Sequence, residues 1–226
     1  MIKYVLFDLD GTLTDSGLGI TKAAKYALED QGIIEEDISK LGFFVGPPLN
    51  LTFMEHYGMD KEHMLRAVAK FREYYNPIGV YENEVYDGVK EMLESLHKAG
   101  LKLAIASSKP QILVNKVLNY FEIDSYFDVI VGSELDGRRT DKNEVVEEAL
   151  RLLMANADET AMVGDRCYDM SGARNHDLMA LGVTYGYGSY LELKNAGADE
   201  IFDDVDSLAK YLLIASGAMK KEAVFA

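Results

Sequence analysis

The sequence alternates short apolar runs with amphipathic stretches, and this alternation restricts the possible folds more than any other feature. Apolar runs without polar alternation occupy residues 3–7, 101–106, 128–131, 160–163 and 178–185, with a weaker run at 200–202. Helical patterns occupy residues 84–99, 110–121, 141–155 and 205–215. Continuous apolar strands are typical of sheets covered on both faces, and intervening helices are typical of βαβ crossovers. The sequence therefore predicts an α/β fold with a doubly wound, mostly parallel sheet.

One connection is too long for a single crossover helix. About 90 residues separate the first two predicted strands, whereas connections in such folds are usually short. Helical patterns fill this stretch at 20–30, 49–56 and 61–76, with a turn signal at 46–48. We therefore expect residues 17–80 to form a helical domain inserted into a core of residues 1–16 and 81–226. The chain end, 217–226, is expected to be lightly packed.

The charge balance bears on the possible partners. Asp and Glu number 38 against 23 Lys and Arg, for a formal net charge of −15. Because an acidic surface repels phosphate backbones and anionic lipid, we expect no nucleic-acid polymer and no membrane as partner. A small anionic substrate stays compatible with this charge, since a local cation can reverse the field in one cleft.

The cysteine count and the apolar runs bear on the compartment. The single cysteine, Cys167, cannot form an internal disulfide. No apolar run is long enough for a signal-peptide core or a membrane span. We therefore expect a cytoplasmic protein that is a monomer or a weak homodimer.

Two acids end the first predicted strand. Asp8 and Asp10 flank Leu9, so their side chains point to the same side of the strand end. Two converging carboxylates need a cation or a shared proton, because burial and mutual repulsion are otherwise costly. The structural alternative is a simple turn, since Asp10-Gly11 is a common turn dipeptide and Asp8 could cap it.

Two further motifs offer groups that bind phosphate. Ser107 and Ser108 follow the second predicted strand and precede Pro110, which we expect in the first turn of a helix. Hydroxyls and free amides at a helix N-terminus bind phosphate oxygens, although serine there is also an ordinary N-cap. Lys142 lies in the first turn of a helix that Asp141 should cap, where a nearby anion would offset the helix dipole. A solvated lysine is the alternative.

The last motif follows the fourth predicted strand. Asp165 and Asp169 can lie on one side of a loop that runs into a helix, and their oxygens suit Mg²⁺. Loop acids in an acidic protein are the alternative, and neighbouring Cys167 is expected to be a bystander. Ligands bind outside the carboxyl ends of strands in such sheets, so Asp8, Ser107 and Asp165 should share one site. A metal, hydroxyls, a lysine and a free carboxylate together indicate phosphoryl transfer.

These motifs, in this order, resemble those of the haloacid dehalogenase superfamily, and specifically its phosphatase branch. The matching positions are Asp8-Leu9-Asp10-Gly11-Thr12, Ser107, Lys142, and Gly164-Asp165 with Asp169. The resemblance spans nearly the whole chain and implies a Rossmann-like core with an inserted helical cap of the C1 type. It further implies a Mg²⁺-dependent phosphomonoester hydrolase that acts on a small phosphorylated metabolite through an aspartyl-phosphate.

The resemblance also implies a role for each motif residue. Asp8 is the implied nucleophile and Asp10 the general acid and base, with Ser107 and Lys142 completing the catalytic set. The implied phosphate-binding residues are Leu9, Gly11, Thr12, Ser107, Ser108 and Lys142. The implied Mg²⁺ site comprises Asp8, Asp10 through its main-chain carbonyl, Asp165, and Asp169 behind the direct ligands. An acid at position 10 favours hydrolysis over the chemistry of the dehalogenase and ATPase branches.

The substrate subgroup is less sharply indicated. Residues 46–49 and 81–84 resemble the phosphoglycolate phosphatase and 5′-nucleotidase-like groups, although Lys142 lacks the Lys-Pro-x-Pro context common in phosphoglycolate phosphatases. A phosphosugar mutase of the same superfamily is one alternative, but Ile20 stands where β-phosphoglucomutase carries a histidine. A non-catalytic phospho-accepting regulatory protein is another.

The predicted insertion suggests a moving cap with its own substrate contacts. Gly17, Gly19 and Gly79 lie near its ends, where they could act as hinges for closure over the site. Candidate cap contacts with the substrate are Asn50, Lys70 and Arg72, with solvated helix faces as the alternative.

Overall fold

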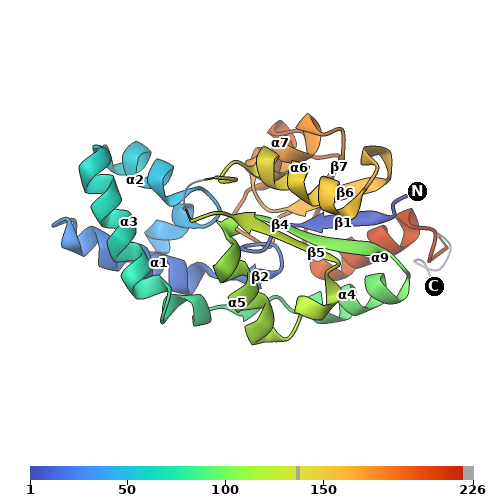
Figure 1. The fold of residues 1–226 in the computed structure, drawn as a ribbon, viewed down its shortest axis with the longest axis horizontal. Helices are drawn as coiled ribbons and strands as arrows, with labels where there is room; N and C mark the ends of the chain where they lie inside the picture. Colours follow the sequence, from blue (N-terminus) through green and yellow to red (C-terminus); the bar gives the residue numbers. More distant parts are fainter. Residues whose placement is uncertain (136–137, 221–226) are drawn as a thin grey trace.

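A six-stranded parallel sheet forms the centre of the computed structural model, which describes residues 1–135 and 138–220 (Figure 1). Its strands are β1 (Tyr4–Phe7), β4 (Lys102–Pro110), β5 (Val129–Ser133), β6 (Thr160–Gly164), β7 (Met179–Val183) and β8 (Glu200–Phe202). Their order is β5-β4-β1-β6-β7-β8, and every neighbouring pair is parallel. The predicted doubly wound sheet is confirmed, and the weak run at 200–202 is its edge strand.

Helices cover both faces of the sheet, which explains the continuous apolar strands. One face carries α4 (Val89–Lys98), α5 (Gln111–Phe121) and α9 (Val205–Ala215), and the other α6 (Lys142–Leu153), α7 (Cys167–Asn175) and α8 (Tyr190–Asn195) (Figure 1). Along β1, Val5 and Phe7 belong to one core cluster and Leu6 to the other. All three side chains are fully buried, so alternation between faces needs no polar residue here.

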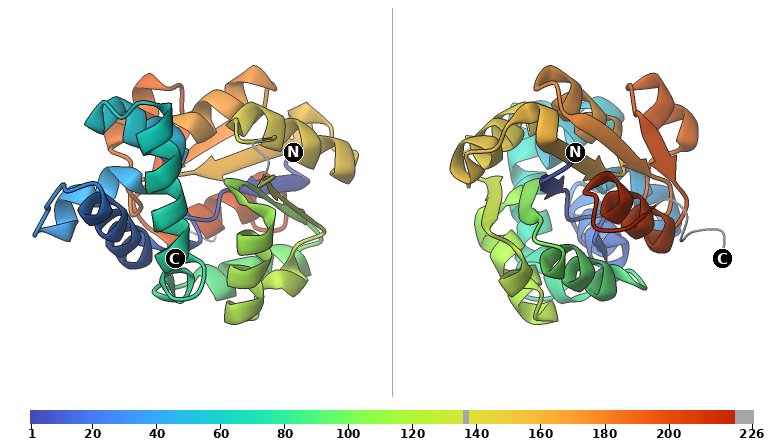
Figure 2. Two further views of the ribbon diagram at one scale, coloured as in Figure 1. Left: turned by 60° about the vertical axis from the view of Figure 1, so that its left-hand side comes forward. Right: turned by 90° about the vertical axis from the view of Figure 1, so that its right-hand side faces the viewer.

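The predicted helical insertion gathers beyond one end of the sheet, on the side away from the N-terminus (Figures 1 and 2). It contains α1 (Gly17–Asp30), η1 (Ile38–Phe44), α2 (Leu49–Tyr57), α3 (Lys61–Tyr75) and η2 (Gly79–Tyr81), where η marks a short 3-10 helix. Helix α1 packs on α3. Both helices carry fully buried alanines, such as Ala24 on α1 and Ala67 on α3, and small side chains allow packed helices a close approach.

The chain crosses between the sheet domain and the insertion twice, and the two crossings lie side by side. Strands β2 (Thr14–Asp15) and β3 (Glu84–Val85) pair antiparallel. Just beyond them, the Gly19 amide donates to the Glu82 carbonyl oxygen at 3.0 Å. The insertion is therefore attached at one narrow point of the core.

Two sequence predictions near these crossings are wrong. The helix predicted over 84–99 starts only at Val89, because Glu84 and Val85 pair with β2 and Gly88 takes a left-handed φ of +83°. Pro110 is not in the first turn of α5. It ends β4 with an extended ψ of 132°, and the helix begins at Gln111.

Smaller differences concern strand and helix ends. The strand predicted over 178–185 covers only Met179–Val183, and α8 was not predicted. Of the tail predicted to be lightly packed, residues 221–226 lie outside the described residues. Among helices of the described residues, none has both the length and the apolar character needed to cross a bilayer.

The crossing point generates a stability prediction. A Cβ at Gly19 would lie 1.9 Å from the Gly79 carbonyl oxygen and 3.0 Å from that of Glu82. Backbone atoms cannot rotate away, so Gly19→Ala should lower the free energy of unfolding by about 1–3 kcal/mol. Urea denaturation measures this. Gly42→Ala is the control: no atom lies within 4 Å of its Cβ, so its unfolding free energy should change by less than about 1 kcal/mol. Equal effects would contradict the prediction.

Candidate active site

The sheet register brings the sequence motifs to one edge. Phe7 on β1 is level with Ile105 on β4 and with Val163 on β6. Ser107, two residues further along β4, and Asp165, directly after the end of β6, therefore flank the loop that follows Phe7. The Asp8 amide continues the ladder by donating to the Val163 carbonyl oxygen at 2.9 Å.

Lys142 links the first and last motifs. Its ammonium group lies 2.8 Å from Asp8 Oδ1 and 2.8 Å from Asp169 Oδ1, and it donates to the Ala106 carbonyl oxygen at 3.0 Å. Asp141 caps α6, as predicted, by accepting from the Asn143 amide. Burial opposes the charge of Lys142, but Asp169 and Asp8 outweigh it and raise its pKa above the usual value. Lys142 is thus a buried, charged lysine and not a solvated one.

Three carboxylates converge beside Lys142. Single oxygens of Asp8, Asp165 and Asp169 lie within 4.8 Å of one another, and all three residues are buried. Asp165 accepts from the Tyr187 amide at 2.8 Å, and Asp169 from the Arg166 amide at 3.0 Å. These main-chain donors hold the acids in place from the loop after β7 and from the start of α7.

Gly11 allows the first loop to meet Asp165. Its φ is +86°, and a Cβ there would lie 2.2 Å from Asp165 Oδ2. Both the left-handed backbone and the lack of space require glycine at this position. Neighbouring Thr12, fully buried, lies with its hydroxyl 3.5 Å from Asp165 Oδ1.

Burial and the neighbouring carboxylates raise the pKa values of two of these acids. Burial, followed by the charges of Asp169 and Asp8, raises the pKa of Asp165 well above its usual value. Burial also raises the pKa of Asp169, to about 6, against the opposing effect of Lys142. In both acids burial is the largest cause of the shift, because it disfavours the charged form of a carboxyl group.

Asp10 turns away from this group and pairs with a lysine that the sequence analysis did not select. Lys109 Nζ lies 2.9 Å from each Asp10 oxygen, and it also contacts the hydroxyl of Tyr75. Burial opposes the charge of Lys109, but Asp10 outweighs it and raises the lysine pKa. Lys109 and Tyr75 thus join the end of β4 to the insertion helix α3. The sequence signal that could have identified Lys109 is a lysine among apolar and small residues at a strand end.

A count of buried charges tests whether this site fits a metal. The buried acidic and basic residues of the described chain are Asp8, Asp10, Asp165, Asp169, Lys109 and Lys142. Lys109 pairs with Asp10, so the group of Asp8, Asp165 and Asp169 faces the ammonium group of Lys142, a formal excess of two negative charges that one divalent cation would balance. Carboxylate oxygens are also the ligands that Mg²⁺ prefers. The residues therefore fit a divalent metal at Asp8, Asp165 and Asp169.

The remaining predicted phosphate-binding residues lie around the same edge. Leu9 is fully buried and Ser107 almost so. Ser107 Oγ accepts weakly from the Lys109 amide, at 3.4 Å. Ser108, half-buried, lines the cavity described next.

A cavity of about 390 Å³ lies between the insertion and the core. Asp10, Ser108 and Lys109 line it from the core, and α3 contributes much of its wall. Of the candidate cap contacts, Asn50 and Arg72 line this cavity. Lys70 does not. Its ammonium group pairs with Glu73 at 2.9 Å on the exposed side of α3.

A second contact joins the insertion to the core. Arg166, at the start of α7, donates to the Val45 carbonyl oxygen at 2.6 Å and to Glu192 at 3.0 Å. Sequence reasoning missed Arg166 and Glu192 because their pairing spans 26 residues and depends on the placement of α8. Neighbouring Cys167 has a free thiol, and its amide donates to Glu192 at 2.9 Å. Its interpretation as a bystander stays a prediction.

The Lys109–Asp10 pair generates a prediction. Lys109→Met leaves Asp10 buried without its partner and should lower the free energy of unfolding by about 3–5 kcal/mol. Lys102→Met is the matched control on the same strand. Lys102 pairs with Asp128 at 2.6 Å, but its side chain is 59% exposed. Lys102→Met should therefore lower the free energy of unfolding by less than about 1 kcal/mol. Urea denaturation compares the two, and similar losses would contradict the prediction.

Known proteins are similar to this chain in sequence and in fold. The profile of the haloacid dehalogenase-like hydrolases matches residues 5–183, more than half of the chain. A 5′-nucleotidase of Pseudomonas aeruginosa is 43% identical over 84% of this chain and 86% of its own. A phosphoglycolate phosphatase of Vibrio cholerae is 29% identical over 95% of this chain and 99% of its own.

A solved structure agrees with these likenesses. The crystal structure of a predicted phosphatase from Clostridium acetobutylicum is 48% identical and superposes with a TM-score of 0.92. The superposition covers 95% of this chain and 99% of that one. The resemblance drawn from the four motifs is confirmed: the chain belongs to the haloacid dehalogenase-like hydrolase family.

Proposed function

We propose that the protein is a Mg²⁺-dependent phosphatase that hydrolyses a small phosphorylated metabolite through a phosphorylated Asp8. The observation that carries the proposal is the set of four buried carboxylates and two buried lysines at the strand ends, next to a cavity. Relatives named 5′-nucleotidase and phosphoglycolate phosphatase support the reaction class.

In the first step, Asp8 attacks phosphorus. Lys142 donates to Oδ1 of Asp8, and no donor among the described residues contacts Oδ2, which is free to form the bond. As the new O–P bond forms, the bond to the leaving oxygen breaks, and Asp10 gives that oxygen a proton. Ser107 and the amides of residues 9–12 would hold the phosphoryl oxygens, with Lys142 beside them.

In the second step, water releases the phosphate. Asp10, now ionised, takes a proton from a water molecule while the oxygen of that water attacks phosphorus. The Asp8–phosphorus bond breaks, and Asp8 and Asp10 return to their starting states. Lys109 acts as a positioning residue, because it contacts both oxygens of Asp10 and fixes the direction of that carboxylate.

Asp8, Asp165 and the main-chain carbonyl of Asp10 would hold Mg²⁺, with Asp169 supporting them. When bound, the ion neutralises charge that develops on the phosphoryl oxygens. The fit rests on the converging carboxylates and on the excess negative charge of the buried groups.

We further propose that residues 17–80 act as a cap domain over a core of 1–16 and 81–226. The contacts that would hold it closed include Tyr75 on Lys109, Arg166 on the Val45 carbonyl and Lys116 on the Asn76 carbonyl. Gly19 and Gly79 touch at the crossing point and would be the hinge. Cytoplasmic location and a monomeric or weakly dimeric state stay predictions of the sequence.

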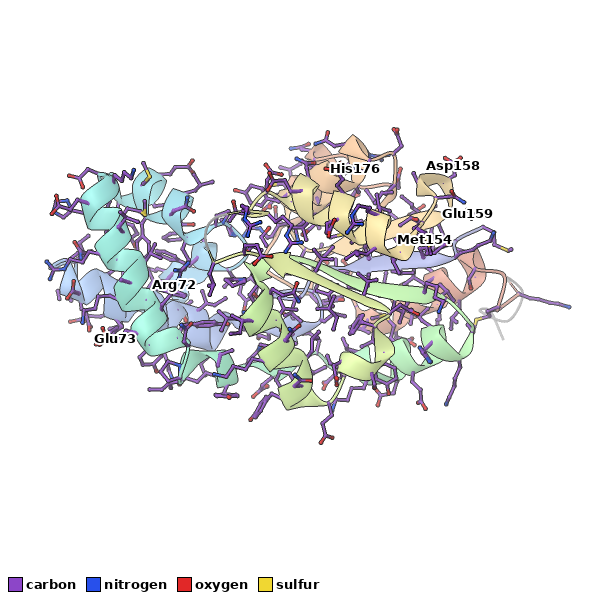
Figure 3. All side chains as sticks on the ribbon, in the orientation of Figure 1. Arg72, Glu73, Met154, Asp158, Glu159 and His176 are labelled. Carbon is purple, nitrogen blue, oxygen red and sulfur yellow. The ribbon has the colours of Figure 1, made fainter. Side chains whose placement is uncertain are left out.

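Substitution of the two strand-end acids tests the mechanism. Asp8→Asn should reduce phosphate release to background, because an amide is a poor nucleophile. Asp10→Asn should lower kcat by about 10²–10⁴-fold, the usual contribution of a general acid or base. Asp158→Asn is the control, an exposed acid far from the insertion (Figure 3). Turnover by Asp8→Asn at the wild-type rate would overturn the mechanism.

Metal binding is testable without activity. Mg²⁺ at about 100 times its dissociation constant should stabilise the wild type by about 2.7 kcal/mol, seen as a higher midpoint of thermal unfolding. Asp165→Asn should remove this gain while it leaves the fold intact, because it also relieves repulsion among the carboxylates. Asp158→Asn should retain the gain. An equal Mg²⁺ effect in Asp165→Asn would place the metal elsewhere.

Mass spectrometry of the protein during turnover separates the two alternatives. Hydrolysis predicts phosphate on Asp8 that disappears within the reaction time. Phosphate that persists on Asp8 for minutes after small phosphodonors are removed would favour the regulatory alternative. Transfer of the phosphate to a second sugar hydroxyl, and not to water, would favour a mutase.

A further inference from the structure

We propose that the cavity beside Asp10 binds a leaving group with a flat aromatic ring, as in a nucleoside monophosphate or an aryl phosphate. This inference rests on the proposed function, because it assigns the substrate class of the same site. It concerns the part of the substrate that the phosphate-binding motifs do not contact.

The position of the cavity follows from the role of Asp10. A general acid has to contact the leaving oxygen, so the group attached to that oxygen extends on the Asp10 side of the phosphate. Asp10 and Lys109 line the cavity, whereas Asp8, Lys142 and Asp165 do not. The cavity is therefore placed for the leaving group and not for the transferred phosphate.

The wall of the cavity is apolar and aromatic. Phe44, Met64 and Phe71 line it and are only 1%, 8% and 4% exposed, and Val68 adds a half-buried aliphatic side chain. Phe71 also stacks on Tyr75, with ring centroids 5.3 Å apart. A flat ring makes more contact with such walls than a short polar chain does. The volume of about 390 Å³ lies in the range of small-molecule sites.

The Lys109–Asp10 pair, which lines the cavity, disfavours a second anionic group close to the phosphate. An ammonium group has three N–H donors. Those of Lys109 meet Asp10 Oδ1, Asp10 Oδ2 and the Tyr75 hydroxyl. A carboxylate two bonds from the phosphate ester, as in phosphoglycolate, would find this cation already occupied. That carboxylate would lose its hydrating water at the apolar wall without gaining a new hydrogen-bond partner.

The lining of the cavity also includes a cation without an acidic partner among the described residues. Arg72 lies on α3 and lines the cavity, and its side chain is exposed (Figure 3). No acidic residue in 1–135 or 138–220 forms an ion pair with its guanidinium. The lining thus combines the Lys109–Asp10 pair, an apolar wall, the cation of Arg72, and Glu134, which pairs with Arg139. A cation without an acidic partner suits a ring that carries polar acceptors.

The first test ranks substrates by kcat/KM in the wild type with Mg²⁺. The probes are uridine 5′-monophosphate, O-phospho-L-tyrosine, 2-phosphoglycolate and methyl phosphate. We expect at least one ring-bearing substrate to exceed both small ones by about tenfold or more, the discrimination an apolar pocket provides. The faster of the two ring substrates distinguishes a nucleoside from an aryl leaving group. Phosphoglycolate as the best substrate would overturn the inference.

The second test narrows the cavity. Val68→Phe should lower kcat/KM for the ring substrates by about tenfold and leave the small substrates within about twofold. Ala69→Phe is the matched control, since Ala69 is the next residue of α3 and exposed. Thermal unfolding checks that both variants fold. Val68→Ala is a second, milder change that should alter kcat/KM only for the ring substrates. Equal losses on all substrates would overturn the inference. Absence of Asp8-dependent phosphate release from every probe would instead overturn the proposed function.

Discussion

The excess of buried negative charge is the constraint on which the rest of the structure depends. Interior carboxylates are costly unless they are paired or coordinate a metal. Here all the buried acidic and basic side chains of the described residues meet at one edge of the sheet, and the acids outnumber the lysines by two. The sheet tolerates this arrangement because the acids lie just beyond its apolar strands, where main-chain amides of loops and of α7 donate to them.

The two buried lysines divide this charge into two halves with separate tasks. Lys142 belongs to the half that contains Asp8 and Asp169, where it leaves one Asp8 oxygen without a protein donor. Lys109 belongs to the half that contains Asp10, and through Tyr75 it reaches the insertion. The proposed nucleophile, Asp8, and the proposed proton donor, Asp10, thus contact different lysines. Of the two lysines, only Lys109 has contacts that depend on where the helical insertion lies.

Much of this could be predicted from sequence, for a local reason. Three of the motifs end buried strands, and parallel strands end at one edge, so Asp8, Ser107 and Asp165 could be brought together without tertiary information. Lys142, in the first turn of a helix, was joined to them by the chemistry of the motifs. The roles assigned to them stay predictions of the family resemblance. Lys109 and Tyr75 could not be paired in this way, because their contact depends on how α3 folds back. The helix predicted over 84–99 failed likewise, since β3 exists only through its pairing with β2.

The side-by-side crossings between core and insertion have a consequence for how such a chain can evolve. The insertion leaves and re-enters the core through one short antiparallel ribbon. A segment whose two ends already meet can be lengthened, shortened or exchanged with little added cost in loop-closure entropy. The acids of the sheet edge and the shape of the cavity beside them can therefore change separately. If the cavity binds the leaving group as proposed, changes in the inserted helices would alter the substrate while the strands that carry the acids stay as they are.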